Sequence, residues 1–225
     1  MITVENVCFS YGKRKIVNGL SFTAEPGECI VFAGHNGAGK STALSVIAGI
    51  LRPTQGAVNV QGRVGIVPQG SALFEDMSVG DNLRFFADLA GCSVPKELPF
   101  GVQRYEKMRV SRLSGGMKKQ VSIACALLGD PGVLLLDEPC AALDVVYRTE
   151  LIELICALKK EGRTVIYVGH EPMEFAAFYD KLIFFGDEIV CHSRAQLSGD
   201  PAEDTRLYAQ FSELFRMNDQ RGEYK

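Results

Sequence analysis

Gly34-His35-Asn36-Gly37-Ala38-Gly39-Lys40-Ser41-Thr42 is the stretch that decides the fold of this 225-residue chain. It matches the pattern G-x-x-x-x-G-K-[ST], whose glycines let successive backbone N–H groups turn toward phosphate oxygens. Residues 29–33 before it form an apolar run that suits a buried strand, and residues 43–48 after it suit a helix. This strand–loop–helix context is what the pattern requires. The stretch therefore predicts a binding site for a nucleoside triphosphate.

Side chains of this loop have predicted roles toward the nucleotide. Lys40 is expected to reach the β- and γ-phosphates, and the Ser41 hydroxyl is expected to ligate Mg²⁺. The helix that begins near Lys40 adds the positive end of its dipole. The loop residues expected around the phosphates are Gly34, Asn36, Gly37, Ala38, Gly39, Lys40, Ser41 and Thr42.

The composition is that of a chain with a large apolar core. Hydrophobic residues make up 47% of it, and the net charge of −3 gives no global attraction to nucleic acid. Met1 leads into a strand pattern rather than a signal peptide, and no stretch approaches the roughly 18 apolar residues of a spanning helix. The cysteines form no C-x-x-C pair and are expected to be buried free thiols in a reducing compartment. They are Cys8, Cys29, Cys92, Cys125, Cys140, Cys156 and Cys191.

Periodicity and turn residues predict the elements around the loop. An antiparallel β region precedes the loop, a small helical lobe spans residues 70–129, and buried strands alternate with helices after it. The expected strands are 2–9, 17–24, 56–60, 63–67, 133–137, 164–168, 181–185 and 188–191. The expected helices are 79–90, 116–128, 144–160 and a tail helix at 201–217, with 102–110 also compatible with a helix, 91–101 a loop, and 218–225 frayed.

Two further motifs make the prediction specific. Leu113-Ser114-Gly115-Gly116 is followed by Gln120, and Leu134-Leu135-Leu136-Asp137-Glu138-Pro139 ends the central apolar strand. With the phosphate loop upstream and in this order, the chain resembles the ATP-binding cassette (ABC) ATPases over nearly all of its length. The resemblance implies an α/β fold, a P-loop NTPase core of ABC ATPase type with an antiparallel β region and a small inserted helical lobe. One domain would cover 1–225, with the core at 1–69 and 130–217.

The resemblance also implies how the nucleotide is held. Tyr11 would stack on the adenine ring, and Val17 would lie among the residues that bind the nucleotide. ATP would bind with Mg²⁺, whose ligands would come from Ser41, Gln69 and Asp137.

The same resemblance implies a catalytic set of Glu138, His170, Gln69 and Lys40. Glu138 would orient or deprotonate the attacking water. His170 would lie near the γ-phosphate, and Gln69 would contact both Mg²⁺ and the water. Gln69 also lies where the α/β core meets the helical lobe, so it would report the γ-phosphate to that lobe.

A second subunit would complete each site. Ser114 and Gly116 would meet the γ-phosphate held by the other subunit, and Asp144 lies in the loop that would cross the dimer seam. The chain departs from the family pattern near these positions. His35 stands where proline is usual, Cys140 and Ala141 replace hydroxyl residues, and Gly169 precedes His170 where threonine or serine is common. None of these changes removes a group that does chemistry.

The implied function is that of an ATP-hydrolysing subunit of an ABC transporter, paired with a second ABC subunit, with no nucleic-acid partner. It would act through a separate transmembrane permease on the cytoplasmic face of the membrane. The stretch from Ser114 to Gln120 and the short helical lobe favour export over import. An importer ATPase and a soluble ABC ATPase of iron–sulphur cluster assembly remain alternatives. A cassette protein of DNA maintenance or translation is disfavoured, because the chain has one cassette and no heptad run.

Overall fold

A computed structural model describes residues 1–141, 143–186 and 188–194 of the chain. The predicted tail helix at 201–217 and the frayed end at 218–225 lie outside the described residues.

A six-stranded sheet forms the centre of the molecule, in the order β5-β6-β7-β3-β8-β9. Its strands are β3 (Cys29–Gly34), β5 (Val64–Val67), β6 (Val133–Asp137), β7 (Thr164–Val168), β8 (Lys181–Phe185) and β9 (Ile189–Ser193). All neighbours pair in parallel except β9, which returns antiparallel to β8 as the predicted hairpin. Val168 is paired with both Phe32 and Asp137, so β3, β6 and β7 end at one edge of the sheet.

The two faces of this sheet make two separate cores. Side chains alternate along a strand, so Val31 of β3 contributes to one core while Ile30 and Phe32 contribute to the other. Strands buried on both faces read as continuous apolar runs, which is why the sequence predicted them well.

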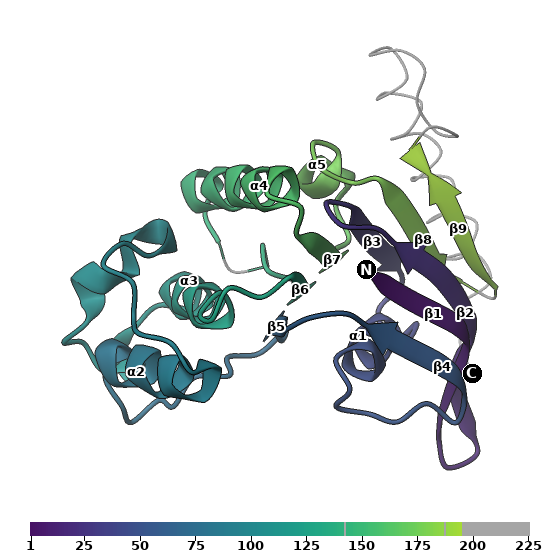
Figure 1. Cartoon of the computed structure of the whole chain (residues 1–225), viewed down its shortest axis with the longest axis horizontal. Helices are drawn as coiled ribbons and strands as arrows, with labels where there is room; N and C mark the ends of the chain where they lie inside the picture. Colours follow the sequence, from purple (N-terminus) through teal and green to yellow (C-terminus); the bar gives the residue numbers. More distant parts are fainter. Residues whose placement is uncertain (142, 187, 195–225) are drawn as a thin grey trace.

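A three-stranded antiparallel sheet covers one face. It contains β1 (Ile2–Tyr11), β2 (Arg14–Ala24) and β4 (Gln55–Val60), with β1 in the middle. Helix α1 (Lys40–Ile47) shares a core with this sheet and with the parallel strands, and it lies beside β1, β2 and β4 in Figure 1. The expected antiparallel β region is therefore present.

Helices α4 (Val145–Lys160) and α5 (Pro172–Phe175) cover the other face (Figure 1). Leu151, Ile155 and Leu158 of α4 are buried in its core, as the predicted apolar stripe requires. The short helix α5 was not predicted, because four residues are too few to show a helical period.

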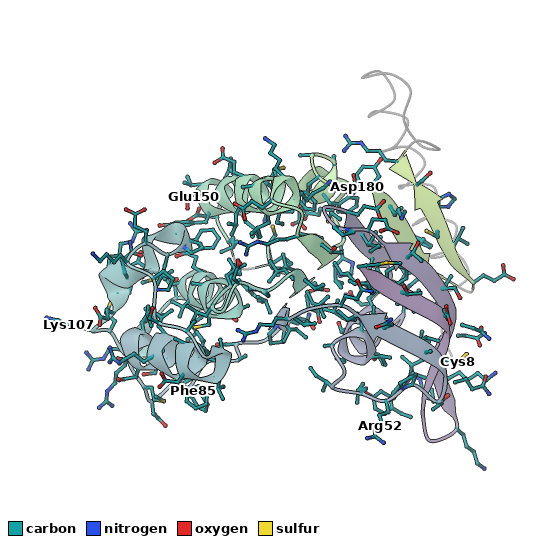
Figure 2. The ribbon with its side chains drawn as sticks, in the orientation of Figure 1. Cys8, Arg52, Phe85, Lys107, Glu150 and Asp180 are labelled. Atoms are coloured by element: carbon teal, nitrogen blue, oxygen red, sulfur yellow. The ribbon has the colours of Figure 1, made fainter. Side chains whose placement is uncertain are left out.

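The helical lobe is inserted in the chain between β5 and β6, and it projects away from the sheet (Figure 1). It contains α2 (Val79–Ala90), the 3₁₀ helices η1 (Pro99–Tyr105) and η2 (Val110–Arg112), and α3 (Gly115–Ala126). Figure 2 shows Phe85 and Lys107 on this lobe, and Cys8 and Arg52 at the opposite end of the molecule.

The helix considered for residues 102–110 does not form, and two short 3₁₀ segments stand there instead. Phe100 and Gly101 have φ values of 59° and 58°, which interrupt helical geometry at the start of the segment. At its end, the Val110 N–H donates to the Met77 carbonyl at 3.0 Å, so the backbone is bound to a neighbouring segment rather than to its own turn.

The expectation that the cysteines are buried was too broad. Cys29, Cys125 and Cys140 are buried, and burial raises the pKa of the Cys140 thiol to about 11. Cys8, Cys92 and Cys156 are partly exposed, and Cys191 on β9 is exposed. All seven are free thiols, as expected.

Candidate functional site

The phosphate loop connects the end of β3 to the start of α1. Gly39 is the N-cap of α1 with φ of 101°, and a Cβ there would lie 2.5 Å from the Ile16 carbonyl oxygen. Only glycine fits both the backbone conformation and the space. No side chain caps this end of α1. The first backbone N–H groups of the helix therefore have no side-chain cap, which is the usual arrangement of an anion site.

Lys40 is buried, with 5% of its surface exposed. Its Nζ donates to the carbonyl oxygens of Gly34 at 2.8 Å and His35 at 2.7 Å. Burial lowers the pKa of Lys40, while the nearby carboxylates of Glu138 and Asp137 oppose this shift. The ammonium is therefore fixed at the centre of the loop, beside two acidic side chains.

Asp137 ends β6 at the same edge of the sheet. Asp137 Oδ1 is buried without a hydrogen-bond partner. Burial raises the pKa of this carboxyl group and Glu138 adds to the rise, while the Ser41 hydroxyl lies close enough to the Asp137 carboxylate to oppose it. An unpaired buried carboxylate oxygen beside a hydroxyl is a suitable ligand pair for a hard cation.

Glu138 is held between two predicted catalytic side chains. Gln69 donates through Nε2 to Glu138 Oε2 at 2.9 Å, and His170 Nε2 lies 2.5 Å from Glu138 Oε1. The three residues follow β5, β6 and β7, whose carboxyl ends are adjacent because these strands are neighbours in the sheet. The backbone of Glu138 has φ of 47°, an uncommon value for a residue with a side chain. Such strained conformations concentrate at functional sites.

One pocket of about 390 Å³ joins the phosphate loop to Gln69 and Glu138, while His170 does not line it. It is lined by Tyr11, Arg14, Ile16, Asn36, Gly37, Gly39, Lys40, Ser41, Thr42, Gln69 and Glu138. Tyr11 is 56% exposed, lines the pocket and packs edge-to-face with Phe9 at a ring-centroid distance of 4.9 Å. Most of the side chains predicted to bind nucleotide therefore meet at one place.

Val17 lies elsewhere. It is 1% exposed, in the core beneath β2, and does not line the pocket. Its neighbour Ile16 and Arg14 line the pocket instead. Alternation along β2 explains the difference, because residues 14 and 16 face one side and residue 17 the other. A strand register correct to one residue would have been needed to find Ile16.

Ser114 and Gly116 do not line this pocket in the single chain. Ser114 is the exposed N-cap of α3, and its hydroxyl accepts from the Met117 N–H at 3.2 Å. Asp144 similarly caps α4 through hydrogen bonds from Val146 and Tyr147. Both helix starts are available at the surface for a neighbouring molecule.

Lys119 of α3 is a site neighbour that the sequence analysis did not assign. It is 7% exposed, and its Nζ donates to the carbonyl oxygens of Pro68 at 2.9 Å and Gln69 at 3.0 Å. Burial lowers its pKa, against the attraction of Asp137 and Glu138. The helix that begins with Ser114 is thereby fastened to the backbone that presents Gln69. The only sequence signal for this role of Lys119 is the basic pair Lys118-Lys119. Such a pair is equally typical of a solvent-exposed helix face.

A comparison with known protein families decides the identity. The ABC transporter family model matches residues 17–141, more than half of the chain. The chain belongs to the ABC transporter family. It is the ATP-binding subunit of such a transporter, an ATPase that converts ATP to ADP and phosphate. The fold predicted from the sequence, an ABC ATPase core with an antiparallel β region, is confirmed.

Relatives of this ABC ATPase include ATP-binding proteins named for linearmycin resistance and for Nod factor export. It is 32% identical to the linearmycin resistance ATP-binding protein LnrL of Bacillus subtilis, over 91% of this chain and 73% of that protein. It is 38% identical to the Nod factor export ATP-binding protein I of Paraburkholderia xenovorans, over 75% of this chain and 62% of that protein. The chain thus spans less than two thirds of the Nod factor protein.

Solved structures show the same fold. A structure of an ATP-binding subunit of an ABC transporter matches with a TM-score of 0.84 and 23% identity, covering 94% of this chain and 99% of that chain. A dimeric ATP-binding cassette in a post-hydrolysis state, bound to ADP and Pi, matches with a TM-score of 0.73 and 22% identity, covering 89% and 100%. ABC cassettes dimerise and pair with transporter membrane subunits. Within its described residues, this ABC ATPase has no helix long and apolar enough to cross a membrane.

Proposed function

We propose that this ABC ATPase drives export through a separate transmembrane permease, with Glu138 as its catalytic carboxylate. The observation that carries the catalytic assignment is the position of Glu138, which contacts Gln69 and His170 at the end of a pocket lined by Lys40 and Ser41. A carboxylate so placed is within reach of a water in line with the terminal phosphate of a nucleotide on the loop.

The loop residues bind and orient the nucleotide. Lys40 carries its charge at the centre of the loop, where it offsets the charge of the β- and γ-phosphates. Backbone N–H groups of residues 36–41 and the start of α1 add further positive potential. Tyr11 offers an exposed aromatic face for the adenine ring. Binding thus fixes the γ-phosphate against Glu138.

The donor set fits Mg²⁺. Ser41 and Asp137 would hold it, with Gln69 at the side of the pocket, and it would neutralise charge that develops on the phosphates. Within residues 1–141, 143–186 and 188–194 no cluster of three or more His, Cys, Asp or Glu side chains could hold a metal by itself. This is the situation expected when the phosphates of the nucleotide supply the remaining ligands.

Hydrolysis then proceeds by attack of water on the γ-phosphorus. The water loses its proton to the Glu138 carboxylate, the bond from the γ-phosphorus to the bridging oxygen breaks, and ADP and phosphate leave. Gln69 and His170 hold the Glu138 side chain from its two oxygens. Ser114 and Gly116 from a second subunit complete the site, since both lie at an exposed helix start outside the pocket of their own chain.

We further propose that residues 1–225 act as one ABC ATPase domain, at the cytoplasmic face of the membrane through the permease. The name of the Nod factor export relative supports the export direction. An importer ATPase and an ATPase of iron–sulphur cluster assembly are the competing functions. Affinity purification from detergent-solubilised membranes separates them: an export permease with several spanning helices is the expected partner. Recovery of a soluble scaffold, or of an import permease with its binding protein, would exclude export.

The catalytic assignment is tested with Glu138→Gln, which keeps the shape of the side chain but removes its charge and basicity. We expect this variant to bind MgATP, to turn over at least about 100-fold more slowly, and to accumulate as a dimer. Light scattering after size-exclusion chromatography, with and without MgATP, measures the dimer.

A second substitution controls for the composite site. Ser114→Arg in the Glu138→Gln background places bulk and charge at the start of α3, outside the nucleotide pocket of the same chain. It should abolish the dimer while the monomer still binds ATP. Turnover of Glu138→Gln at the parent rate would show that Glu138 is not the catalytic carboxylate. Persistence of the dimer in the double variant would remove Ser114 from the seam.

A further inference from the structure

Tyr167 is a fully buried tyrosine three residues before His170. Cys140 and Gly169, two positions at which the chain departs from the family pattern, lie close to it. Tyr167 is 0% exposed in β7, on the face that α4 and α5 cover (Figure 1). Its hydroxyl donates to Glu174 Oε2 at 2.8 Å and lies close enough to the Cys140 thiol to influence its pKa. Gly169 lies two residues further along the chain. One side chain therefore connects the loop after Glu138 to the helix after His170.

Gly169 is required for space rather than for backbone conformation. A Cβ at this position would lie 2.4 Å from Cε1 of the Tyr167 ring and 3.2 Å from its Cδ1, and its φ is not in the left-handed region. The Tyr167 ring has little room to move aside, because the Phe178 ring packs edge-on against it at a centroid distance of 5.2 Å and the Phe175 ring lies tilted at 6.5 Å. While Tyr167 is present, residue 169 can carry no side chain. Glycine here is a consequence of the tyrosine.

Hydrogen bonds hold both ends of the segment that carries His170. Before His170, the Gly169 N–H donates to the Phe32 carbonyl at 3.2 Å. After it, Tyr167 holds Glu174 in the first turn of α5. Burial raises the pKa of Tyr167, so its hydroxyl remains a neutral donor. Between these two anchors lies the imidazole whose Nε2 is 2.5 Å from Glu138.

The acceptor of the tyrosine hydroxyl is itself held by α4. Glu174 is 9% exposed, and Arg148 Nη1 lies 3.7 Å from its Oε1 and 3.3 Å from Glu171 Oε2. Arg148 is one turn into the helix that Asp144 caps. Tyr167 thus contacts α5 through Glu174, and Glu174 in turn connects it to Arg148 of α4.

We propose that Tyr167 is a positioning residue for ATP hydrolysis, which holds His170 against Glu138 through Glu174 and Cys140 and requires glycine at position 169. The inference rests on the proposed role of Glu138 and His170. Tyr167 itself is fully buried and does not line the nucleotide pocket. Its effect is on the placement of the histidine.

A set of substitutions separates the effect of the Tyr167 ring from the effect of its hydroxyl. Gly169→Ser should lower the melting temperature and kcat, because its Cβ collides with the ring; a displacement of 1 Å can cost on the order of 100-fold in rate. Adding Tyr167→Leu removes the ring edge and should restore much of the melting temperature. Adding Tyr167→Phe keeps the ring edge and should restore nothing. Equal rescue by Leu and Phe, or by neither, would overturn the steric part of the proposal.

Tyr167→Phe alone tests positioning, and it is conservative enough to fold. The chain has three histidines, so each ring C–H signal in a ¹H–¹³C NMR spectrum can be assigned by single His→Gln substitutions. In the nucleotide-free protein, Tyr167→Phe should move the His170 signals and leave those of His35 and His192 in place. In turnover assays it should lower kcat about threefold to tenfold with KM for ATP unchanged, because the hydroxyl lies outside the nucleotide pocket.

These readouts distinguish failure of the inference from failure of the proposed function. Unmoved His170 signals in Tyr167→Phe would show that the tyrosine does not position the histidine, whatever the ATPase rate. Moved signals with an unchanged kcat would show that the placement of His170 does not matter for hydrolysis, which overturns the proposed role of Tyr167 as a positioning residue for that reaction. If Glu138→Gln retains parental turnover while the His170 signals move as expected, the catalytic assignment fails and the structural link remains.

Discussion

Replacing Lys119 with methionine tests how firmly the helical lobe is fastened to the nucleotide site. Methionine keeps the length and the apolar stem but has no donor. Two hydrogen bonds from the ammonium, to the carbonyls of Pro68 and Gln69, are lost. Hydrogen bonds to charged groups contribute about 1.5–3 kcal/mol each, or about 3–6 kcal/mol together. The lowered pKa of Lys119 shows that burial of the charge offsets part of this. We therefore expect a net loss of about 2–4 kcal/mol in the free energy of unfolding.

The neighbouring residue provides a matched control. Lys118 makes a 2.6 Å ion pair with Glu75, and the two side chains are 22% and 57% exposed. Exposed pairs contribute about 0.2–1 kcal/mol, so Lys118→Met should cost less than about 1 kcal/mol. Urea denaturation of the nucleotide-free protein measures both values. Equal destabilisation by the two substitutions would refute the reasoning, because the buried contacts of Lys119 would then add nothing over a surface charge.

Two further substitutions test the nucleotide site. Tyr11→Ala should weaken ATP binding by about 1–3 kcal/mol, roughly 5- to 150-fold, while Tyr11→Phe should be nearly unchanged, since the ring face is retained; equal affinities for the parent and both variants in calorimetry would exclude stacking. Burial raises the pKa of Asp137, so the stability linked to its proton is complete below about pH 4 and is lost as the pH rises through the raised folded pKa. Neutral Asp137→Asn should therefore melt above the parent at pH 7, approach it toward pH 4, and lose MgATP turnover; a lower melting temperature than the parent at pH 7 would contradict this.

Local signals determined most elements of this fold. The bounds of α2 were predicted at Val79–Ala90, and a capping box between Ser78 and Asp81 fixes its start through contacts only three residues apart. The strand at Thr164–Val168 was equally clear, because its five residues are all buried. The segment 102–110 was misread, because the positive φ of Phe100 and the bond from Val110 to Met77 depend on packing within the lobe.

The sequence by itself determined the chemistry available to this ABC ATPase: a glycine loop with Lys40 and Ser41, and two carboxylates at the end of an apolar strand. These are short-range patterns, and the backbone geometry they need is set by residues adjacent in the chain. Only the tertiary structure decided how the groups meet. Gln69, Glu138 and His170 converge because β5, β6 and β7 are neighbours, an order that no local pattern contains. Long-range packing likewise decided that Ile16 rather than Val17 faces the pocket and that Lys119 holds the backbone of Gln69, because each depends on segments brought together only by the folded cores.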